Sequence, residues 1–275
     1  MKLKYLGTAA AEAIPGMFCN CRVCQNALAV RGKEIKTRSQ AIVDDSLLID
    51  FPPDTYMHVI NCGLDLRFVH HCIITHSHFD HLFADDFWCR LEGIAHDIGE
   101  EPLNVYLTNA GYEKAKSLLG GNFDGKRLKF HKIVPFEPFL IESYRIIPLA
   151  ADHDKSTDPV IYIIEKGDKT LLYANDTGIF PESTWEYLKS YDRVFDFISL
   201  DCTGMLLTGW VHSHMGLDTN KQTEDRLREM GLCNDKTVVY VNHFSHNGLA
   251  THEEMVVEAA KYGYGVTYDG LDVEI

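Results

Sequence analysis

The chain has 275 residues, 45% hydrophobic and 24% charged, so it is long enough to bury the core of a globular protein. A formal net charge of −14 argues against a protein that binds long nucleic acid through a basic surface. The N-terminus lacks an apolar signal-peptide core, and no segment reaches the roughly 18 apolar residues of a membrane span. We therefore expect a cytoplasmic protein without a membrane partner.

Strand-like apolar runs recur along the chain, with amphipathic segments between them. The predicted strands lie in 2–7, 40–51, 68–75, 104–107, 139–149, 160–165, 170–176, 197–202, 237–244 and 265–275. The predicted helices cover 53–61, 82–95, 110–119, 181–190, 219–230 and 252–262. Some strands are paired as hairpins, as around Gly167 and Asp168, and others are followed by helices. This order predicts an α/β (α+β) fold of mixed sheets covered by helices, as one domain over 1–275.

Three cysteines lie within six positions near the N-terminus, in the segment GMFCNCRVCQN: Cys19, Cys21 and Cys24. Eight cysteines in all are too few for a disulfide scaffold, and a close cluster in a reducing compartment is more often metal-binding or catalytic. By themselves the residues leave three interpretations open: metal ligands, a redox pair or unligated thiols.

The segment CIITHSHFDHLF carries most of the predicted chemistry, with His76, His78, Asp80 and His81 within six positions. In an extended segment His76 and His78 point to the same side, because side chains alternate with a period of two. If a helix begins near Phe79, Asp80 and His81 turn toward the same space from its first turn. Imidazole and carboxylate ligands suit zinc, manganese or iron, so the segment predicts two neighbouring sets of metal ligands.

Two metal ions need further ligands, and the chain offers them at the ends of later strands. His153, Asp176 and His243 each follow an apolar run directly. Taken singly, each is more often a turn or surface residue. Together with the HSHFDH segment, they predict ligands gathered from separate strands at one edge of a sheet.

HSHFDH followed by isolated His153, Asp176 and His243 resembles the metallo-β-lactamase fold superfamily. YLGTAAAEAIP, LLIDFPPD, DTGIFPE and YDGLDVEI extend the resemblance over the whole chain. It implies a four-layer αβ/βα sandwich with a dinuclear site at one edge. It also implies these roles: His76, His78 and His153 for one metal, Asp80, His81 and His243 for the other, Asp176 as the bridge, and Asp50 as the carboxylate that supports the histidine loop. The two divalent ions would be zinc or manganese, with iron as a further alternative.

The cysteine cluster resembles the phosphodiesterase that opens the cyclic phosphate of a phosphoribosyl ester in the carbon–phosphorus lyase pathway. That resemblance implies a structural zinc bound by Cys19, Cys21, Cys24 and His246, with the N-terminal zinc-binding loop at about 15–30. A closed site of three cysteines and one histidine would fasten this loop to the C-terminal region.

The implied activity is hydrolysis of a small anionic phosphodiester, expected to be a cyclic ribose phosphate, by a metal-bridging hydroxide. The charge of the two ions would exceed that of the bridging hydroxide and the two aspartates, Asp80 and Asp176, by about one unit. Asp80 and His214 are the expected catalytic residues, with His214 as general acid or phosphate contact and His212 as its competitor. The segment before His214 is more apolar than the family pattern, and two of its residues, Met205 and Trp210, either line the substrate pocket or pack the loop.

Several alternatives stay open. The pyrroloquinoline-quinone biosynthesis protein of the same fold also has close cysteines, and transfer RNA 3′ processing nucleases share the metal ligands. A non-catalytic metal-bound scaffold is the alternative from a different functional class. The resemblance also suggests a homodimer.

Overall fold

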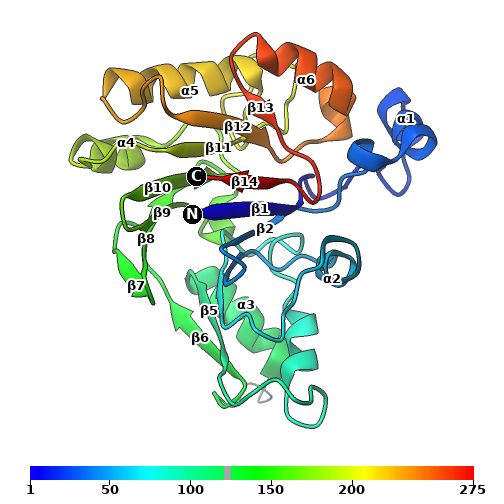
Figure 1. The fold of residues 1–275 in the computed structure, drawn as a ribbon, viewed down its shortest axis with the longest axis vertical. Coiled ribbons are helices and arrows are strands. Elements are labelled where there is room, and N and C mark those ends of the chain that lie inside the picture. The colour runs from blue at the N-terminus through cyan, green and yellow to red at the C-terminus, as the bar shows by residue number, and fades with distance from the viewer. Residues whose placement is uncertain (121–124) are drawn as a thin grey trace.

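Two mixed β-sheets pack face to face in the computed structural model, which describes residues 1–120 and 125–275 (Figure 1). The first sheet has the order β14 (Asp272–Glu274), β1 (Lys2–Gly7), β2 (Gln40–Val43), β3 (Leu47–Ile49), β4 (His71–Ile73), β5 (Leu103–Leu107) and β6 (Leu128–Lys132). The second has the order β13 (Gly265–Val266), β12 (Val238–Asn242), β11 (Phe197–Asp201), β10 (Lys169–Ala174), β9 (Val160–Lys166), β8 (Tyr144–Ala150) and β7 (Phe139–Ile141). Pairing is antiparallel from β14 to β3 and from β7 to β10, and parallel in the remainder of each sheet.

Helices cover both outer faces. They are α1 (Arg22–Val30), α2 (Thr55–Cys62), α3 (Asn109–Leu119), α4 (Glu182–Lys189), α5 (Leu217–Glu229) and α6 (His252–Ala260). Short 3₁₀ segments lie at η1 (Gly32–Glu34), η2 (Ala84–Arg90), η4 (Lys155–Thr157) and η5 (His246–Gly248). In Figure 1, α4, α5 and α6 lie on the side of the second sheet and α2 and α3 on the side of the first. None of the helices in the described part of the chain is long and apolar enough to cross a membrane.

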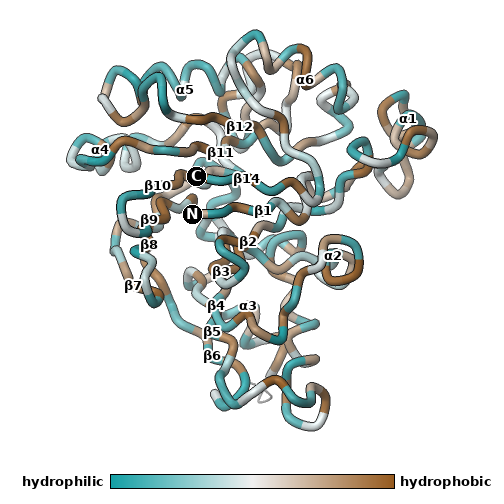
Figure 2. Tube along the Cα trace, in the orientation of Figure 1, coloured by the Kyte–Doolittle hydropathy of each residue, from teal (hydrophilic) through white to brown (hydrophobic). Residues whose placement is uncertain are grey.

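The alternation of side chains along the central strands creates separate apolar layers. In β10, Leu171 and Tyr173 face the core between the sheets, whereas Leu172 and Ala174 face the core beneath α4, α5 and α6. A third cluster joins the outer face of the first sheet to α3 through Leu119 and its neighbours. Figure 2 shows the same contrast, with hydrophobic residues along β11 and β12 and mostly hydrophilic residues along α5. The expected four-layer αβ/βα sandwich is therefore confirmed.

Several local predictions need correction. The Gly167–Asp168 hairpin is present between β9 and β10, but β6 and α1 were not predicted, and α1 occupies much of the expected cysteine loop. The helix expected over 82–95 is the shorter 3₁₀ segment η2. No helix begins near Phe79, because the chain from His78 to Leu82 closes a turn in which the backbone N–H of Leu82 donates to the carbonyl of His78 at 2.8 Å. This turn, rather than a helix, presents Asp80 and His81.

Candidate metal centre

The predicted ligands meet where strands of both sheets end. The histidine segment follows β4, and His153, Asp176 and His243 follow β8, β10 and β12. Since β10 runs parallel to β11 and β11 to β12, their carboxyl ends lie at one edge.

Three of the site residues that follow strands have left-handed backbone conformations. The φ angles are 66° at Asp50, 52° at Asp176 and 66° at His243. For a residue other than glycine, this backbone conformation costs about 1 kcal/mol, because the Cβ atom lies too close to the following carbonyl oxygen. Such conformations cluster at functional sites, and here each one turns a polar side chain away from the path of the strand that precedes it.

The first ligand set consists of His76, His78 and His153. His76 Nε2 lies 2.9 Å from His78 Nδ1, and His153 Nε2 lies 3.2 Å from the same atom. Nitrogens about 2.0–2.1 Å from a common zinc ion lie about 3.3 Å apart in a tetrahedron, so these three atoms fit one ion.

The second set consists of Asp80, His81 and His243, whose ligand atoms all lie within 4.8 Å of one another. Asp176 faces both sets: Oδ1 lies 3.7 Å from His153 Nε2, and Oδ2 lies 2.8 Å from His81 Nε2 and 2.9 Å from His243 Nε2. Despite these short distances, Asp176 Oδ2 and the two histidine nitrogens are buried and have no partner in hydrogen-bond geometry among the described residues. Buried polar atoms are rarely left in this state, and a shared cation would satisfy all three.

Neighbouring charges shift the pKa values of Asp176 and His81 in opposite directions. Burial alone would raise the pKa of Asp176, but His243 and His81 hold it well below its usual range. Burial would lower the pKa of His81, but Asp176, Asp50 and Asp80 raise it well above its usual value. Asp176 is therefore ionised at neutral pH, as a carboxylate ligand must be, whereas His81 would have to release a proton before it could bind a metal.

Buried polar groups hold the His81 ring in place through Nδ1, the nitrogen that faces away from Asp176. His81 Nδ1 lies 2.7 Å from Asp50 Oδ2. Asp50 also accepts hydrogen bonds from the backbone N–H of Thr75 at 2.7 Å and from the Thr75 hydroxyl. This contact places the Nδ1 proton toward Asp50 and leaves Nε2 as the nitrogen that could bind a metal.

Asp201 and Thr203 also lie in the site, although no role was predicted for either residue. Asp201 Oδ2 lies 3.0 Å from His214 Nδ1 and 3.3 Å from His243 Nδ1, and Thr203 Oγ1 lies 2.9 Å from His243 Nδ1. Burial would lower the pKa of His214, but Asp201 raises it above its ordinary value. Asp201 ends β11, so the rule that located Asp176 would have found it.

A cavity of about 330 Å³ opens above the ligands. His214 and Trp210 line it, whereas His212 is absent from its lining, is 85% exposed and pairs with Asp152 at 3.0 Å. Met205 is 1% exposed and packs in the core. The cavity is thus lined by His214 and not by His212, and by Trp210 and not by Met205.

A second group of ligand atoms lies apart from this cavity. The side chains of Cys19, Cys21, Cys24 and His246 bring their sulfur and nitrogen atoms within 4.8 Å of one another. His246 Nδ1 lies 3.6 Å from Cys19 Sγ and 3.8 Å from Cys21 Sγ, close to the spacing of about 3.8 Å between ligands of a tetrahedral zinc with sulfur at about 2.3 Å. A Cβ atom at Gly16 would lie 2.9 Å from His246 Nε2, so only glycine fits beside this cluster. These residues could hold a structural zinc.

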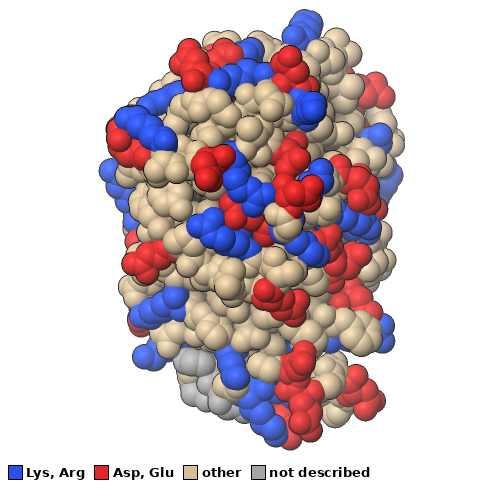
Figure 3. All heavy atoms as spheres, turned by 60° about the vertical axis from the view of Figure 1, so that its left-hand side comes forward, with Lys and Arg blue, Asp and Glu red and all other residues tan. Residues whose placement is uncertain are grey.

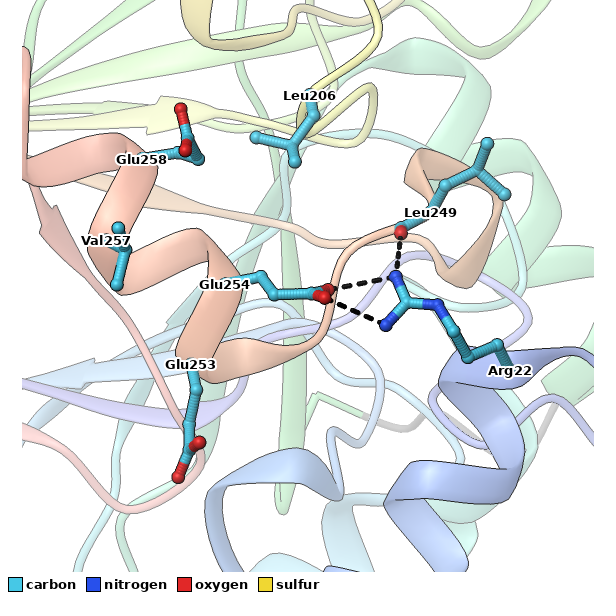
Figure 4. A pocket seen from close by; sticks show the side chains of 7 residues that line it. All are labelled: Arg22, Leu206, Leu249, Glu253, Glu254, Val257 and Glu258. Atoms are coloured by element: carbon cyan, nitrogen blue, oxygen red, sulfur yellow. Dashed lines mark hydrogen bonds and ion pairs between the residues drawn. The ribbon is translucent and has the colours of Figure 1, made fainter.

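An ion pair joins the cysteine segment to α6 (Figure 4). The Arg22 guanidinium donates to both carboxylate oxygens of Glu254 at 2.9 Å and to the carbonyl of Leu249 at 2.7 Å. Glu254 also closes the capping box of α6 with Thr251. The N-terminal segment and the C-terminal helix are thus connected beside the cluster.

Comparison with known proteins places this geometry in a family. The family model for the beta-lactamase superfamily domain matches residues 48–244. An octanoyltransferase from Porphyromonas gingivalis is 24% identical over 283 residues, which cover 100% of this chain and 52% of that protein. The chain therefore spans about half the length of the curated relative it matches.

Solved structures share the fold over the whole chain. A new diphosphatase from the PhnP family is 21% identical, with a TM-score of 0.73 and coverage of 100% of this chain and 97% of that one. Zn²⁺-bound PqqB from Methylobacterium extorquens is 20% identical, with a TM-score of 0.73 and full coverage of both chains. The short form of human tRNase Z is 13% identical, with a TM-score of 0.66 and coverage of 100% and 99%. The chain belongs to the beta-lactamase superfamily and has the metallo-β-lactamase fold of a metal-dependent hydrolase.

Proposed function

We propose that the protein is a dinuclear metal-dependent phosphodiesterase that hydrolyses a small phosphodiester, with a cyclic ribose phosphate as the first substrate to test. The observation that carries the proposal is the position of Asp176 between two complete ligand sets, at the floor of a cavity that also holds His214. The structural similarity to a diphosphatase of the PhnP family supports phosphoester chemistry.

Each ligand set has a defined task in this proposal. His76, His78 and His153 would hold one metal, Asp80, His81 and His243 the other, and Asp176 both. Zinc, manganese and iron all suit these donors. When bound, such ions lower the pKa of a coordinated water and neutralise charge on phosphoryl oxygens.

His214 is placed to return a proton to the leaving group. Its Nδ1 faces Asp201, so Nδ1 keeps its proton and Nε2 is the nitrogen available for transfer. The raised pKa favours the imidazolium that a general acid requires near neutral pH. Transfer of the Nε2 proton to the departing alkoxide oxygen leaves neutral His214 with its Nδ1–H still donated to Asp201.

The other functions suggested for this fold differ in what they require. A tRNA-processing enzyme needs a large basic surface, whereas the face in Figure 3 shows lysines and arginines interspersed with aspartates and glutamates. The formal net charge of −14 points the same way. A PqqB-like role or a non-catalytic scaffold would retain the metals without phosphodiester turnover.

Phosphorus NMR tests the proposal directly. Metal-loaded protein is incubated with a phosphoribosyl cyclic phosphate, with bis(p-nitrophenyl) phosphate and, separately, with a lactam. We expect turnover of at least one phosphodiester and none of the lactam. Turnover of the linear ester alone would retain the chemistry and reject the cyclic substrate. No phosphodiester turnover with two metals bound would reject the proposal in favour of a PqqB-like role or a scaffold.

A further inference from the structure

Among the described residues that line the cavity there is neither lysine nor arginine. Apart from the proposed metal ligands, the lining residues are Ala10, Ala11, Glu12, Thr203, Trp210, His214, Ser245 and Asn247. A second phosphate on a bound substrate would therefore meet no lysine or arginine among these residues.

Glu12 is the one carboxylate of this wall outside the proposed ligand sets. The Ser245 hydroxyl and the Asn247 side-chain amide both donate to Oε1, the latter at 3.3 Å. In the described part of the chain, Oε2 has no hydrogen-bond or ion-pair partner. The two bonds hold the carboxylate at the wall and leave one oxygen for a donor from a ligand.

Trp210 supplies an aromatic surface in the same cavity. It is half-buried, and its position depends on Gly204, because a Cβ atom there would lie 3.1 Å from Trp210 Cδ2. The face of an indole ring attracts cations, and the Glu12 carboxylate lines the same cavity. One more carboxylate lies beside the cavity: Asp154 is 3.3 Å from Nε2 of His78, which lines it.

From this arrangement we infer that the cavity selects phosphoesters whose remaining part carries an ammonium group, with Glu12 as the residue that determines this specificity. The inference rests on the proposed function, in which the metals bind the phosphoryl group, and it names the chemistry of the rest of the substrate. The phosphoribosyl cyclic phosphate chosen above as the first test of hydrolysis carries a second phosphate, so this inference ranks it below an amino-alcohol ester as a ligand.

Three monoesters of similar size test the inference by binding alone. Isothermal titration calorimetry on the metal-loaded protein compares phosphoethanolamine, n-propyl phosphate and phosphoglycolate, whose tails are positive, neutral and negative. We expect phosphoethanolamine to bind at least tenfold more tightly than phosphoglycolate, with n-propyl phosphate between them.

Two variants separate the local effect from general electrostatics. Glu12→Gln keeps an acceptor for Ser245 and Asn247 but removes the charge, and it should reduce the ratio of the two Kd values to below about threefold. Glu253→Gln removes one charge from an exposed position on α6, outside the cavity, and should retain the ratio.

The outcomes test the inference about Glu12 separately from the proposed phosphodiesterase activity. Equal weakening of all three ligands in Glu12→Gln, with the ratio unchanged, would assign Glu12 a structural role and overturn the inference. Preference for phosphoglycolate in the unmodified protein would also overturn it. Because binding is measured without turnover, failure to hydrolyse any diester rejects the proposed phosphodiesterase independently of this result.

Discussion

Asp50 Oδ2 lies 2.7 Å from His81 Nδ1, and both side chains are completely buried. Burial raises the pKa of Asp50, although His81 and Thr75 oppose this effect. A charge in this position is stable only because the imidazole and the Thr75 groups surround it. The contact fixes the ring whose other nitrogen faces Asp176.

Replacement of Asp50 by Asn should weaken metal binding without changing any proposed ligand. An amide cannot accept the Nδ1 proton with the strength of a carboxylate, so we expect a loss of roughly 10–100-fold in affinity for the second metal. Competition with a chromophoric chelator measures it. Thr75→Val is the matched variant, since it removes one hydroxyl donor and leaves the charge, and its loss should be smaller. Wild-type affinity in Asp50→Asn would show that Asp50 serves only the fold.

Substitutions at Asp80 and His214 should differ in their effect on metal content. Asp80→Ala removes a proposed ligand, so we expect one metal fewer per chain and loss of bis(p-nitrophenyl) phosphate hydrolysis by ~1,000-fold or more. His214→Ala should retain both metals and slow the opening of a phosphoribosyl cyclic phosphate, whose leaving group is an alkoxide, by about 100-fold, within the usual contribution of a general acid. Its effect on bis(p-nitrophenyl) phosphate should be much smaller, because p-nitrophenolate leaves without a proton. Elemental analysis and initial rates separate the two effects.

His212→Ala is the control for this pair, because the exposed His212 side chain lies outside the cavity lining. Its rate should stay within about twofold of wild type, as for a surface substitution away from the site. A loss as large as that of His214→Ala would exchange the roles of the two histidines.

The cysteine cluster should hold one zinc that is independent of the active site. Cys21→Ser should lower the zinc content by one per chain and lower the Tm, because it releases the segment that Arg22 connects to α6. Cys89→Ser changes an exposed cysteine outside the cluster and should leave both quantities unchanged. Identical metal content in the two variants would favour unligated thiols or a redox pair.

His252 should make the stability depend on pH below neutrality. Burial, followed by the positive charges of Lys36 and Lys33, lowers the pKa of His252 to about 4, while Glu34 accepts its backbone N–H. Between pH 6.5 and 4 the unfolded chain binds a proton that the folded chain does not, so stability falls with pH in this range. The contribution between pH 7 and pH 5 is at most about 2 kcal/mol.

Urea unfolding of the wild type and of His252→Gln at these two pH values checks this contribution. The variant should lose less stability on acidification than the wild type, because glutamine does not titrate. Equal losses would mean that other groups account for the acid sensitivity.

The sequence by itself determined the class of the fold and located most of the side chains that meet in the site. Period-two patterns identified most strands, and polar ligand types directly after them identified His153, Asp176 and His243, because a strand end is where a side chain can leave the core. The HSHFDH segment was recognisable by itself, because it has four possible metal ligands within six positions. The short helix α1 was missed since its sequence is dominated by the cysteine spacing, and β6 is a strand with mostly polar side chains.

Only the tertiary structure decided which side chains meet. Local rules suggested that a helix presents Asp80, but a turn does so, because the contacts around Asp50 and Asp176 hold this segment. His212 and His214 are two positions apart and alike in sequence, yet one pairs with Asp152 on the surface and the other with Asp201 in the cavity. Glu12 and Asn247 lie 235 positions apart and share a hydrogen bond. Such pairs follow from the packing of the two sheets, which brings distant strand ends together and which no local pattern records.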